Sequence, residues 1–278
     1  MNYYNHPSMS RSKIVDLDKM TPYKFWCKHI DNSIVQESTQ ALDFGRAFHS
    51  KILEPQLFNN EFCFMPKIDK RTKLGKLEYE EFINKNSCKK FLDNKDFTML
   101  NSMYESMNSD KFIDAKKMID SCDSKEEEFY FELQDLKFKA KLDAINTKDN
   151  IIIDVKTCRE SFVDGLHFGK EMIKYGNAEQ VYIYTEAYKA KYNADPYFYF
   201  ITFEKVAPFE IQIFDASALY EFGKQKVTNL INKYKDLLER FGGNTWIDSN
   251  IQYAELPAWA EYQCEEVSLI LDDEKVTI

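Results

Sequence analysis

Residues 136–156 read LKFKAKLDAINTKDNIIIDVK, and this stretch decides the fold. Up to Ile145 apolar and polar residues alternate, which is typical of a strand with one buried face. Residues 151–156 form a β-branched run with a charged end, which indicates a second strand. Asp143 and Asp154 lie a hairpin's distance apart in the chain, so we expect the two strands to bring their carboxylates together.

Three charged side chains at the ends of these strands form the candidate site. Side chains alternate between the faces of a strand, so Asp154 and Lys156 point the same way. Together with Asp143 they offer hard oxygen ligands, which suit Mg²⁺ because this ion keeps several waters and takes phosphate oxygens. A metal there polarises a scissile phosphate, and the lysine neutralises developing charge. The alternative is that these charges are simply solvated at a strand end.

The surrounding elements predict one α/β domain over 1–278, with a central mixed sheet flanked by helices. Residues 1–124 are expected to be mainly helical, 125–215 to form the sheet core, and 216–278 to add a C-terminal helix and tail. Residues 129–133 pair with 136–145 in a hairpin whose turn, Gln134-Asp135, lacks glycine, so its type stays open. The other expected elements are a helix capped by Thr21 with Pro22, a helix capped by Ser38 that stops before Pro55, helices 74–86, 95–107, 161–175, 178–192 and 216–241, and strands 151–156, 197–203 and 209–214.

Composition excludes several classes of protein. Hydrophobic residues make up 44% of the 278 residues and aromatic residues 15%, which is too many for a disordered chain. No apolar run approaches the ~20 residues of a membrane helix, and the first twenty residues lack the apolar core of a signal peptide. The six cysteines contain no CxxC pair, so zinc and iron–sulfur spacing are absent and reduced thiols are favoured. We expect a protein of the bacterial cytoplasm.

The net charge of −9 argues against a general nucleic-acid binder, although it is an average over the whole chain. A site that needs carboxylates for a metal can make a DNA enzyme acidic. One segment is locally basic, with Lys67, Lys70, Arg71, Lys73 and Lys76 against the single acid Asp69. Such a segment can follow phosphates. It could equally be a solvated loop.

Further candidates lie outside the two strands. The acidic run 126–128 precedes the hairpin and could add a third carboxylate, or it could be a solvated turn. Gln180 and Tyr184 are spaced i, i+4 and therefore share one helix face, where they could also be ordinary packing residues. His49 shares an apolar helix face with Leu42, Gly45 and Ile52, so it could be a ligand or a core histidine.

The pattern Asp143…Asp154-Val155-Lys156 resembles the PD-(D/E)xK nuclease signature. More narrowly, the chain resembles the RecE-type (exodeoxyribonuclease VIII-like) exonucleases of phages and prophages, which are related to λ exonuclease. The resemblance covers nearly the whole chain. It rests on the ordered set YYNHPSMSRS (3–12), TPYKF (21–25), FGRAFH (44–49), LEP (53–55), KRTK (70–73), KAKLD (139–143), DVKT (154–157), QVYIY (180–184) and LPAW (256–259).

This resemblance implies a restriction-endonuclease-like core and a role for each matching residue. His49, Asp143, Asp154 and the Val155 carbonyl would surround two Mg²⁺ ions, for which Mn²⁺ could substitute. A glutamate of 126–128 would join them, with Glu126 favoured over Glu128. The catalytic lysine would be Lys156, with Gln180 and Tyr184 holding the DNA backbone or the attacking water. The expected DNA contacts are Lys70, Arg71, Lys73, Lys139 and Lys141.

One of these contacts departs from the family. Lys141 stands where the family often has Arg, which loses a bidentate phosphate contact but keeps the charge.

The activity implied by the resemblance is Mg²⁺-dependent exonuclease action on the ends of linear double-stranded DNA. It would run 5′→3′, release mononucleotides and leave a 3′ single strand for a RecT-type annealing protein. A ring-shaped homo-oligomer would surround the DNA, so that only its channel need be basic. The alternatives are a structure-specific or restriction-type endonuclease on the same fold, and a catalytically inactive DNA-binding module. Closed circular DNA separates the two kinds of nuclease.

Overall fold

The computed structural model describes residues 3–34, 39–247, 254–257 and 260. It divides the chain into two compact units, Met1–Thr245 and Trp246–Ile278. Most of the second unit lies outside the described residues, as do Ala258 and Trp259 of the C-terminal motif. The single domain expected over 1–278 therefore stays a prediction.

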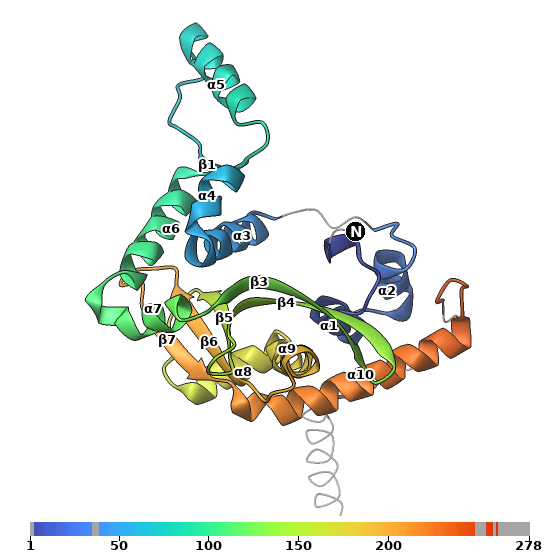
Figure 1. The fold of residues 1–278 in the computed structure, drawn as a ribbon. Coiled ribbons are helices and arrows are strands. Elements are labelled where there is room, and N and C mark those ends of the chain that lie inside the picture. The colour runs from blue at the N-terminus through green and yellow to red at the C-terminus, as the bar shows by residue number, and fades with distance from the viewer. Residues whose placement is uncertain (1–2, 35–38, 248–253, 258–259, 261–278) are drawn as a thin grey trace, which may run out of the picture. The chain divides into compact units, whose positions relative to one another are not determined.

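A five-stranded mixed sheet forms the centre of the first unit (Figure 1). Its strands lie in the order of the chain and are β3 (Ser124–Leu133), β4 (Leu136–Asn146), β5 (Ile151–Cys158), β6 (Tyr197–Glu204) and β7 (Ile211–Asp215). All neighbours are antiparallel except β5 and β6, which run parallel and are joined through helices. The predicted α/β class with a helix-flanked mixed sheet is confirmed.

The hairpin turn that sequence left open has a simple geometry. Gln134 and Asp135 both adopt positive φ, at 50° and 62°. Two consecutive left-handed residues make the type I′ turn, whose twist matches the right-handed twist of the paired strands. Glycine is the usual residue there, so the absence of glycine hid the turn type from sequence.

Helices come before, within and after the sheet in the chain, and they cover both of its faces. They are α1 (Arg11–Lys19), α2 (Pro22–His29), α3 (Gln40–Leu53), α4 (Pro55–Glu61), α5 (Lys73–Lys85), α6 (Asn94–Met107), α7 (Ile113–Asp120), α8 (Gly165–Lys174), α9 (Asn177–Tyr192) and α10 (Tyr220–Phe241), with 3-10 turns at Tyr3–Asn5, Asp110–Phe112 and Ser217–Leu219. Among the described residues, none of these helices has the length and apolar character that a membrane crossing requires.

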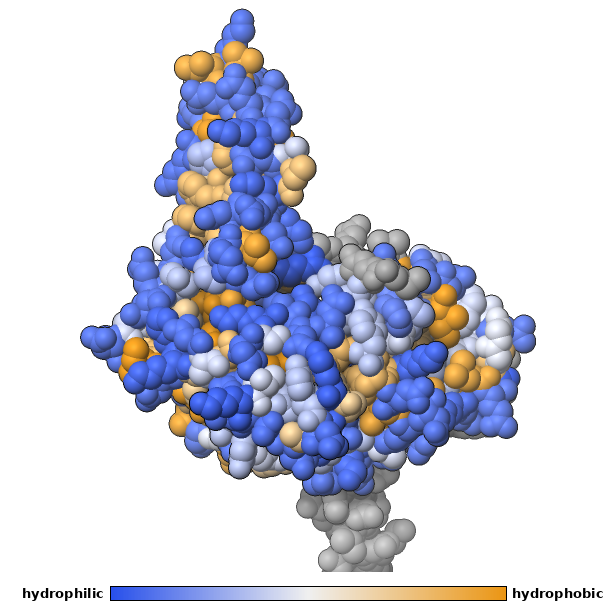
Figure 2. Space-filling view, in the orientation of Figure 1, coloured by the Kyte–Doolittle hydropathy of each residue, from blue (hydrophilic) through white to orange (hydrophobic). Residues whose placement is uncertain are grey.

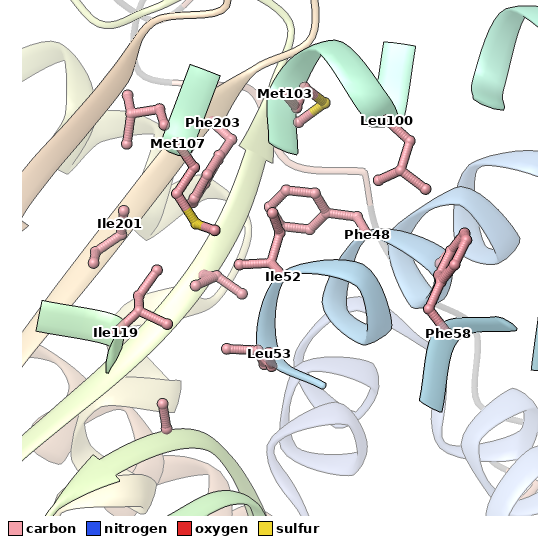
Figure 3. Packing of buried hydrophobic residues seen from close by; sticks show 14 of the residues in the cluster. Phe48, Ile52, Leu53, Phe58, Leu100, Met103, Met107, Ile119, Ile201 and Phe203 are labelled. Atoms are coloured by element: carbon pink, nitrogen blue, oxygen red, sulfur yellow. The ribbon is translucent and has the colours of Figure 1, made fainter. Parts of the chain in front are cut away.

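One face of the sheet packs against α3, α6 and α7. Phe48 and Ile52 of α3 meet Met103 of α6 and Phe203 of β6 in this core (Figure 3). The other face packs against α8 and α9, where Phe168 of α8 and aliphatic residues of α9 cover β4, β5 and β6. The two helical layers hold β5 rigidly from both sides, and β5 carries Asp154 and Lys156.

The caps of the N-terminal helices follow the expected chemistry, with one correction. The Thr21 side chain accepts a hydrogen bond from the Lys24 amide, and Pro22 takes the first helical position. Ser38 was expected to cap the next helix, but α3 is capped by Thr39, whose side chain accepts from the Leu42 amide. Both residues carry a hydroxyl group, so the sequence preference for N-caps does not tell them apart. The helix ends at Leu53, before Pro55, as expected.

An arm carries the basic segment. It rises from two short parallel strands, β1 (Phe62–Phe64) and β2 (Lys90–Leu92), and ends in α5 (Figure 1). These strands were not expected, because three-residue strands leave almost no periodic signal. Figure 2 shows hydrophobic atoms gathered at the end of this arm on an otherwise mostly hydrophilic face, and Leu74 and Leu77 of α5 are exposed.

Candidate active site

The carboxylates of Glu126, Asp143 and Asp154 come from three neighbouring strands. Between β3 and β4, Glu126 and Asp143 lie between the paired residues Lys125–Ala144 and Glu127–Leu142. Between β4 and β5, Asp143 and Asp154 adjoin the last paired residues, Ala144 and Ile153. Neighbouring strands lie about 5 Å apart, so acidic side chains at adjacent positions can converge.

The backbone departs from regular strand pairing at two points beside these carboxylates. Glu126 has a φ of 53°, a left-handed conformation that costs roughly 1–2 kcal/mol for a residue with a Cβ. The paired part of β4 and β5 ends at Ala144 and Ile153, and beyond it the Asp143 carboxylate accepts the Val155 amide at 2.9 Å. This side-chain hydrogen bond takes the place of a backbone hydrogen bond between the two strands and fixes Asp143 against β5. Strained backbone at a charged cluster is typical of a functional site.

His49 completes a group that could hold a metal ion. Its Nδ1 lies 3.5 Å from Asp143 Oδ2 and 3.7 Å from Glu126 Oε1. One ligand atom from each of these three residues falls within a 4.8 Å span. α3 positions His49 because Phe48 and Ile52 anchor the helix in the core. The imidazole itself lies at the edge of that core, with 30% of its side chain exposed.

The prediction of a single apolar face on α3 is therefore partly wrong. Ile52 is buried, but Leu42 is exposed, and it lines a cleft together with Gly45 and His49. The four residues were assigned to one face by their spacing, yet the face splits between core and cleft. The geometry favours His49 as a site residue over a core histidine.

A second group of side chains adjoins the first. Lys156 Nζ lies 2.6 Å from Asp154 Oδ2 and donates to Gln180 Oε1 at 3.1 Å. The Gln180 side-chain amide in turn donates to Asp154 Oδ1. The three side chains close a ring of contacts between β5 and α9. Asp154 is 1% exposed, so these contacts take the place of water around its carboxylate.

The two aspartates have opposite pKa shifts. Burial, followed by the charge of Asp143, raises the pKa of Asp154 to about 6. Burial also opposes ionisation of Asp143, but the charge and hydrogen bond of His49 outweigh it and lower the pKa of Asp143. Burial disfavours the His49 cation, yet Asp143 and Glu126 raise the pKa of His49 to about 10. The two carboxylates therefore favour the His49 cation beside them.

Two clefts meet at this site. The first, which we name the acidic cleft, has a volume of about 530 Å³ and is lined by Glu54, Glu61 and Glu126 among others. The second, the basic cleft, has a volume of about 480 Å³ and is lined by Arg11, Lys13 and Lys156 among others. His49, Asp143 and Tyr4 line both clefts.

The structure separates the three glutamates of the acidic run. Glu126 faces the site, where Lys141 Nζ lies 2.5 Å from its Oε2. Glu127 instead accepts from Lys191 and Tyr192 of α9, and Glu128 is exposed and accepts from the Tyr130 hydroxyl. Of the three, Glu126 is the one beside His49, and its expected role as a metal ligand stays a prediction.

Other expected site residues are distributed as follows. Tyr184 lines the basic cleft with Gln180, as a shared helix face predicts. Lys70, Arg71 and Lys73 lie on the arm, where Lys70 sits over the Tyr79 ring and Arg71 pairs with Asp69. The role of the Val155 carbonyl as a metal ligand stays a prediction.

Lys139 ties the N-terminal segment to β4. It is 5% exposed, and its ammonium donates to the carbonyls of Tyr3, Tyr4 and His6 at 2.6, 3.3 and 2.9 Å. Lys139 also lines the basic cleft, and its expected contact with DNA stays a prediction. The alternating charges of β4 did not predict this interaction of Lys139 with the N-terminal segment.

The N-terminal segment is the part of the site that sequence reasoning left without a role. Tyr4, Arg11 and Lys13 line the basic cleft. Arg11 is held by the carbonyls of Tyr175 and Gly176, just ahead of α9. The resemblance had included residues 3–12, but nothing in their local pattern indicates that they fold back over β4.

The donor set fits a divalent cation. His49, Glu126 and Asp143 offer one nitrogen and two carboxylate groups. Carboxylates suit Mg²⁺ and Mn²⁺, whereas an imidazole is also a ligand of ions such as Zn²⁺. These donors therefore do not identify the ion.

Comparisons with known proteins concern the α/β fold described above. The family described as "PDDEXK-like domain of unknown function" (DUF3799) matches residues 10–242. The crystal structure named "putative exonuclease" from Eubacterium rectale is similar, with a TM-score of 0.58 at 13% sequence identity, over 92% of this chain and 96% of that chain. At that identity the likeness concerns the fold alone. No curated protein matches the chain.

Proposed function

This chain belongs to the family of PDDEXK-like domains (DUF3799), and on that premise we propose that it is a metal-dependent deoxyribonuclease. One observation carries the proposal. The possible metal ligands His49, Glu126 and Asp143 stand directly beside the Asp154–Lys156 pair, at the junction of two clefts. A structural ion-pair network would not need an open cleft on either side.

The residues divide the chemistry between them. A divalent cation held by His49, Glu126 and Asp143 would supply Lewis-acid polarisation of a phosphate ester. Gln180 and Asp154 fix the Lys156 ammonium on the wall of the basic cleft, where it offsets charge that develops on the phosphate. Asp154 lines the same cleft, with its two oxygens held by Lys156 and Gln180, and burial and the charge of Asp143 raise its pKa to about 6.

We further propose the finer activity that the sequence resemblance implies. The enzyme is an exonuclease on the ends of linear double-stranded DNA, works 5′→3′ with Mg²⁺, and leaves a 3′ strand for a RecT-type annealing protein. It acts as a ring in the bacterial cytoplasm. The RecE-like sequence motifs support this proposal, and the name of the E. rectale structure is consistent with exonuclease activity.

Digestion of end-labelled DNA tests the proposal. Linear duplexes labelled at the 5′ or the 3′ end, and a closed circle, are incubated with Mg²⁺ or EDTA. We expect early release of the 5′ label, a resistant circle and no digestion in EDTA. Lys156→Ala should lower the rate at least about 100-fold, because a positioned catalytic group contributes that much or more. A nicked or linearised circle would indicate an endonuclease, and wild-type activity of Lys156→Ala would reject the site.

A further inference from the structure

Lys139 and Lys141 lie two residues apart on β4 but line different clefts. Lys139 lines the basic cleft, whereas Lys141 lines the acidic cleft together with Glu54, Glu61 and Glu126. A phosphate that approached Lys141 would meet these carboxylates, and like charges repel one another. The position of Lys141 therefore favours a role toward the carboxylates over a contact with DNA.

Lys141 holds one oxygen of the Glu126 carboxylate. Its Nζ lies 2.5 Å from Glu126 Oε2, whereas Glu126 Oε1 lies 3.7 Å from His49 Nδ1. Both partners are largely buried, with 28% of the Lys141 side chain and 20% of the Glu126 side chain exposed. Salt and water therefore weaken this ion pair less than one on the open surface. With Oε2 held by Lys141, Oε1 is the oxygen turned toward the candidate ligand His49.

Strand pairing alone does not fix the orientation of Glu126. β3 pairs with β4 at Lys125 and again at Glu127, and Glu126 lies between these paired residues with a φ of 53°. Other carboxylates also surround it. Burial and the charge of Glu126 raise the pKa of Glu54, and Lys141 opposes this rise. Without the Lys141 ammonium, repulsion from neighbouring carboxylates would turn Glu126 away from the site.

We propose that Lys141 is a positioning residue that orients Glu126 as a metal ligand and makes no contact with phosphate. This inference rests on the proposed nuclease function and specifies how its metal site is built. A residue that holds a metal ligand by a hydrogen bond commonly contributes about 10- to 100-fold to metal affinity. The alternative is the DNA contact that the sequence resemblance implies, which predicts a loss of DNA affinity instead.

Titration of Mn²⁺ into the full chain without DNA tests the inference. Electron paramagnetic resonance measures the Mn²⁺ that remains free. Lys141→Met keeps a long side chain without its charge, and it should weaken Mn²⁺ binding about 10- to 100-fold. Removal of a cation would by charge alone tighten Mn²⁺ binding, so the sign of the change separates orientation from charge. Lys141→Arg should bind Mn²⁺ as the wild type does.

Two further variants exclude a merely structural effect. Lys141→Met in a Glu126→Gln background should weaken Mn²⁺ binding no further, because the two residues act through one contact. Lys191→Met removes the lysine that pairs with Glu127, the next residue of β3, outside both clefts, and should bind Mn²⁺ normally. Unchanged or tighter binding by Lys141→Met, a further loss in the double variant, or an equal loss in Lys191→Met would overturn the inference.

Duplex binding in EDTA at several salt concentrations addresses the alternative. Lys141→Met should match the wild type in affinity and in salt slope. Loss of a phosphate contact would instead lower the affinity and reduce the slope by about 0.9. Such a reduced slope would assign Lys141 to the DNA and overturn the inference.

The outcomes also separate this inference from the proposed function. If the wild type binds Mn²⁺ and digests DNA but Lys141→Met binds Mn²⁺ equally well, the positioning role alone is wrong. If Mn²⁺ binding depends on Lys141 but the wild type digests no DNA, the nuclease activity is wrong and the positioning role stands.

Discussion

Asp143 and Asp154 show how neighbouring residues of one type acquire different properties. Both are buried, but the His49 cation and a backbone amide stabilise the Asp143 carboxylate, whereas burial and the charge of Asp143 outweigh the effect of Lys156 on Asp154. One carboxyl is therefore held ionised and the other retains a pKa near neutrality. Separation of two carboxyl pKa values in this way is typical of acid–base sites.

The raised pKa of Asp154 predicts a pH-dependent stability. Between its ordinary value of 3.8 and about 6, the folded state holds a proton that the unfolded state has lost. Stability should therefore fall as pH rises through this window, by up to about 3 kcal/mol. Asp154→Asn should be inactive, and in EDTA above pH 6 it should melt higher than the wild type. An equal melting temperature for the two proteins at pH 8 would contradict the assigned burial.

His49 predicts a dependence of the same sign at higher pH. Its pKa is raised from 6.5 to about 10, so its charge stabilises the metal-free fold fully below pH 6.5 and loses that effect as pH rises through 10. His49→Leu should thus melt below the wild type at pH 7, and the gap should narrow by pH 10. It should also weaken activation by Mg²⁺. His167→Leu, an exposed histidine on α8, is the control. A stabilised and fully active His49→Leu would restore the core role.

At the scale of elements, local patterns predicted most of the fold. The strand and helix positions followed from alternation and capping, as with Thr21 and Pro22. Local sequence patterns did not predict features that depend on residues distant in the chain. The pairing of β1 with β2 depends on a closed arm, and the burial of Lys139 depends on carbonyls of residues 3–6. The site followed the same rule, because strand pairing predicted Asp143 beside Asp154 but not the N-terminal segment over it.

Left-handed residues at two points of β3–β4 predict a contrasting pair of variants. Asp135 has a φ of 62° in an exposed turn, so Asp135→Gly should stabilise the fold by about 1 kcal/mol. Glu126 has a φ of 53°, and Glu126→Gly should relieve the same strain but leave Lys141 unpaired and abolish digestion. Urea unfolding and DNA digestion measure both effects. An active Glu126→Gly would remove this residue from the site.

Over the whole molecule, charge is distributed unevenly. The chain carries −9, so it is repelled by DNA beyond contact, although salt screens this repulsion within about 8 Å at physiological ionic strength. Contact must then depend on local cations. The basic cleft supplies them at the site, and the arm supplies Lys70, Arg71 and Lys73 at some remove.

The arm therefore predicts a change in DNA binding that leaves the chemistry intact. Reversal of Lys70, Arg71 and Lys73 to Glu should weaken duplex binding strongly and flatten its salt dependence, because each lost cation no longer releases counterions. Cleavage of a very short duplex at high enzyme concentration should survive better than digestion of long DNA. Reversal of Lys170, Lys174 and Lys224, on α8 and α10, changes the net charge equally and should have a much smaller effect. If the arm variant and this control bind alike, and both match the wild type in salt slope, the arm is a solvated loop and the DNA path lies elsewhere.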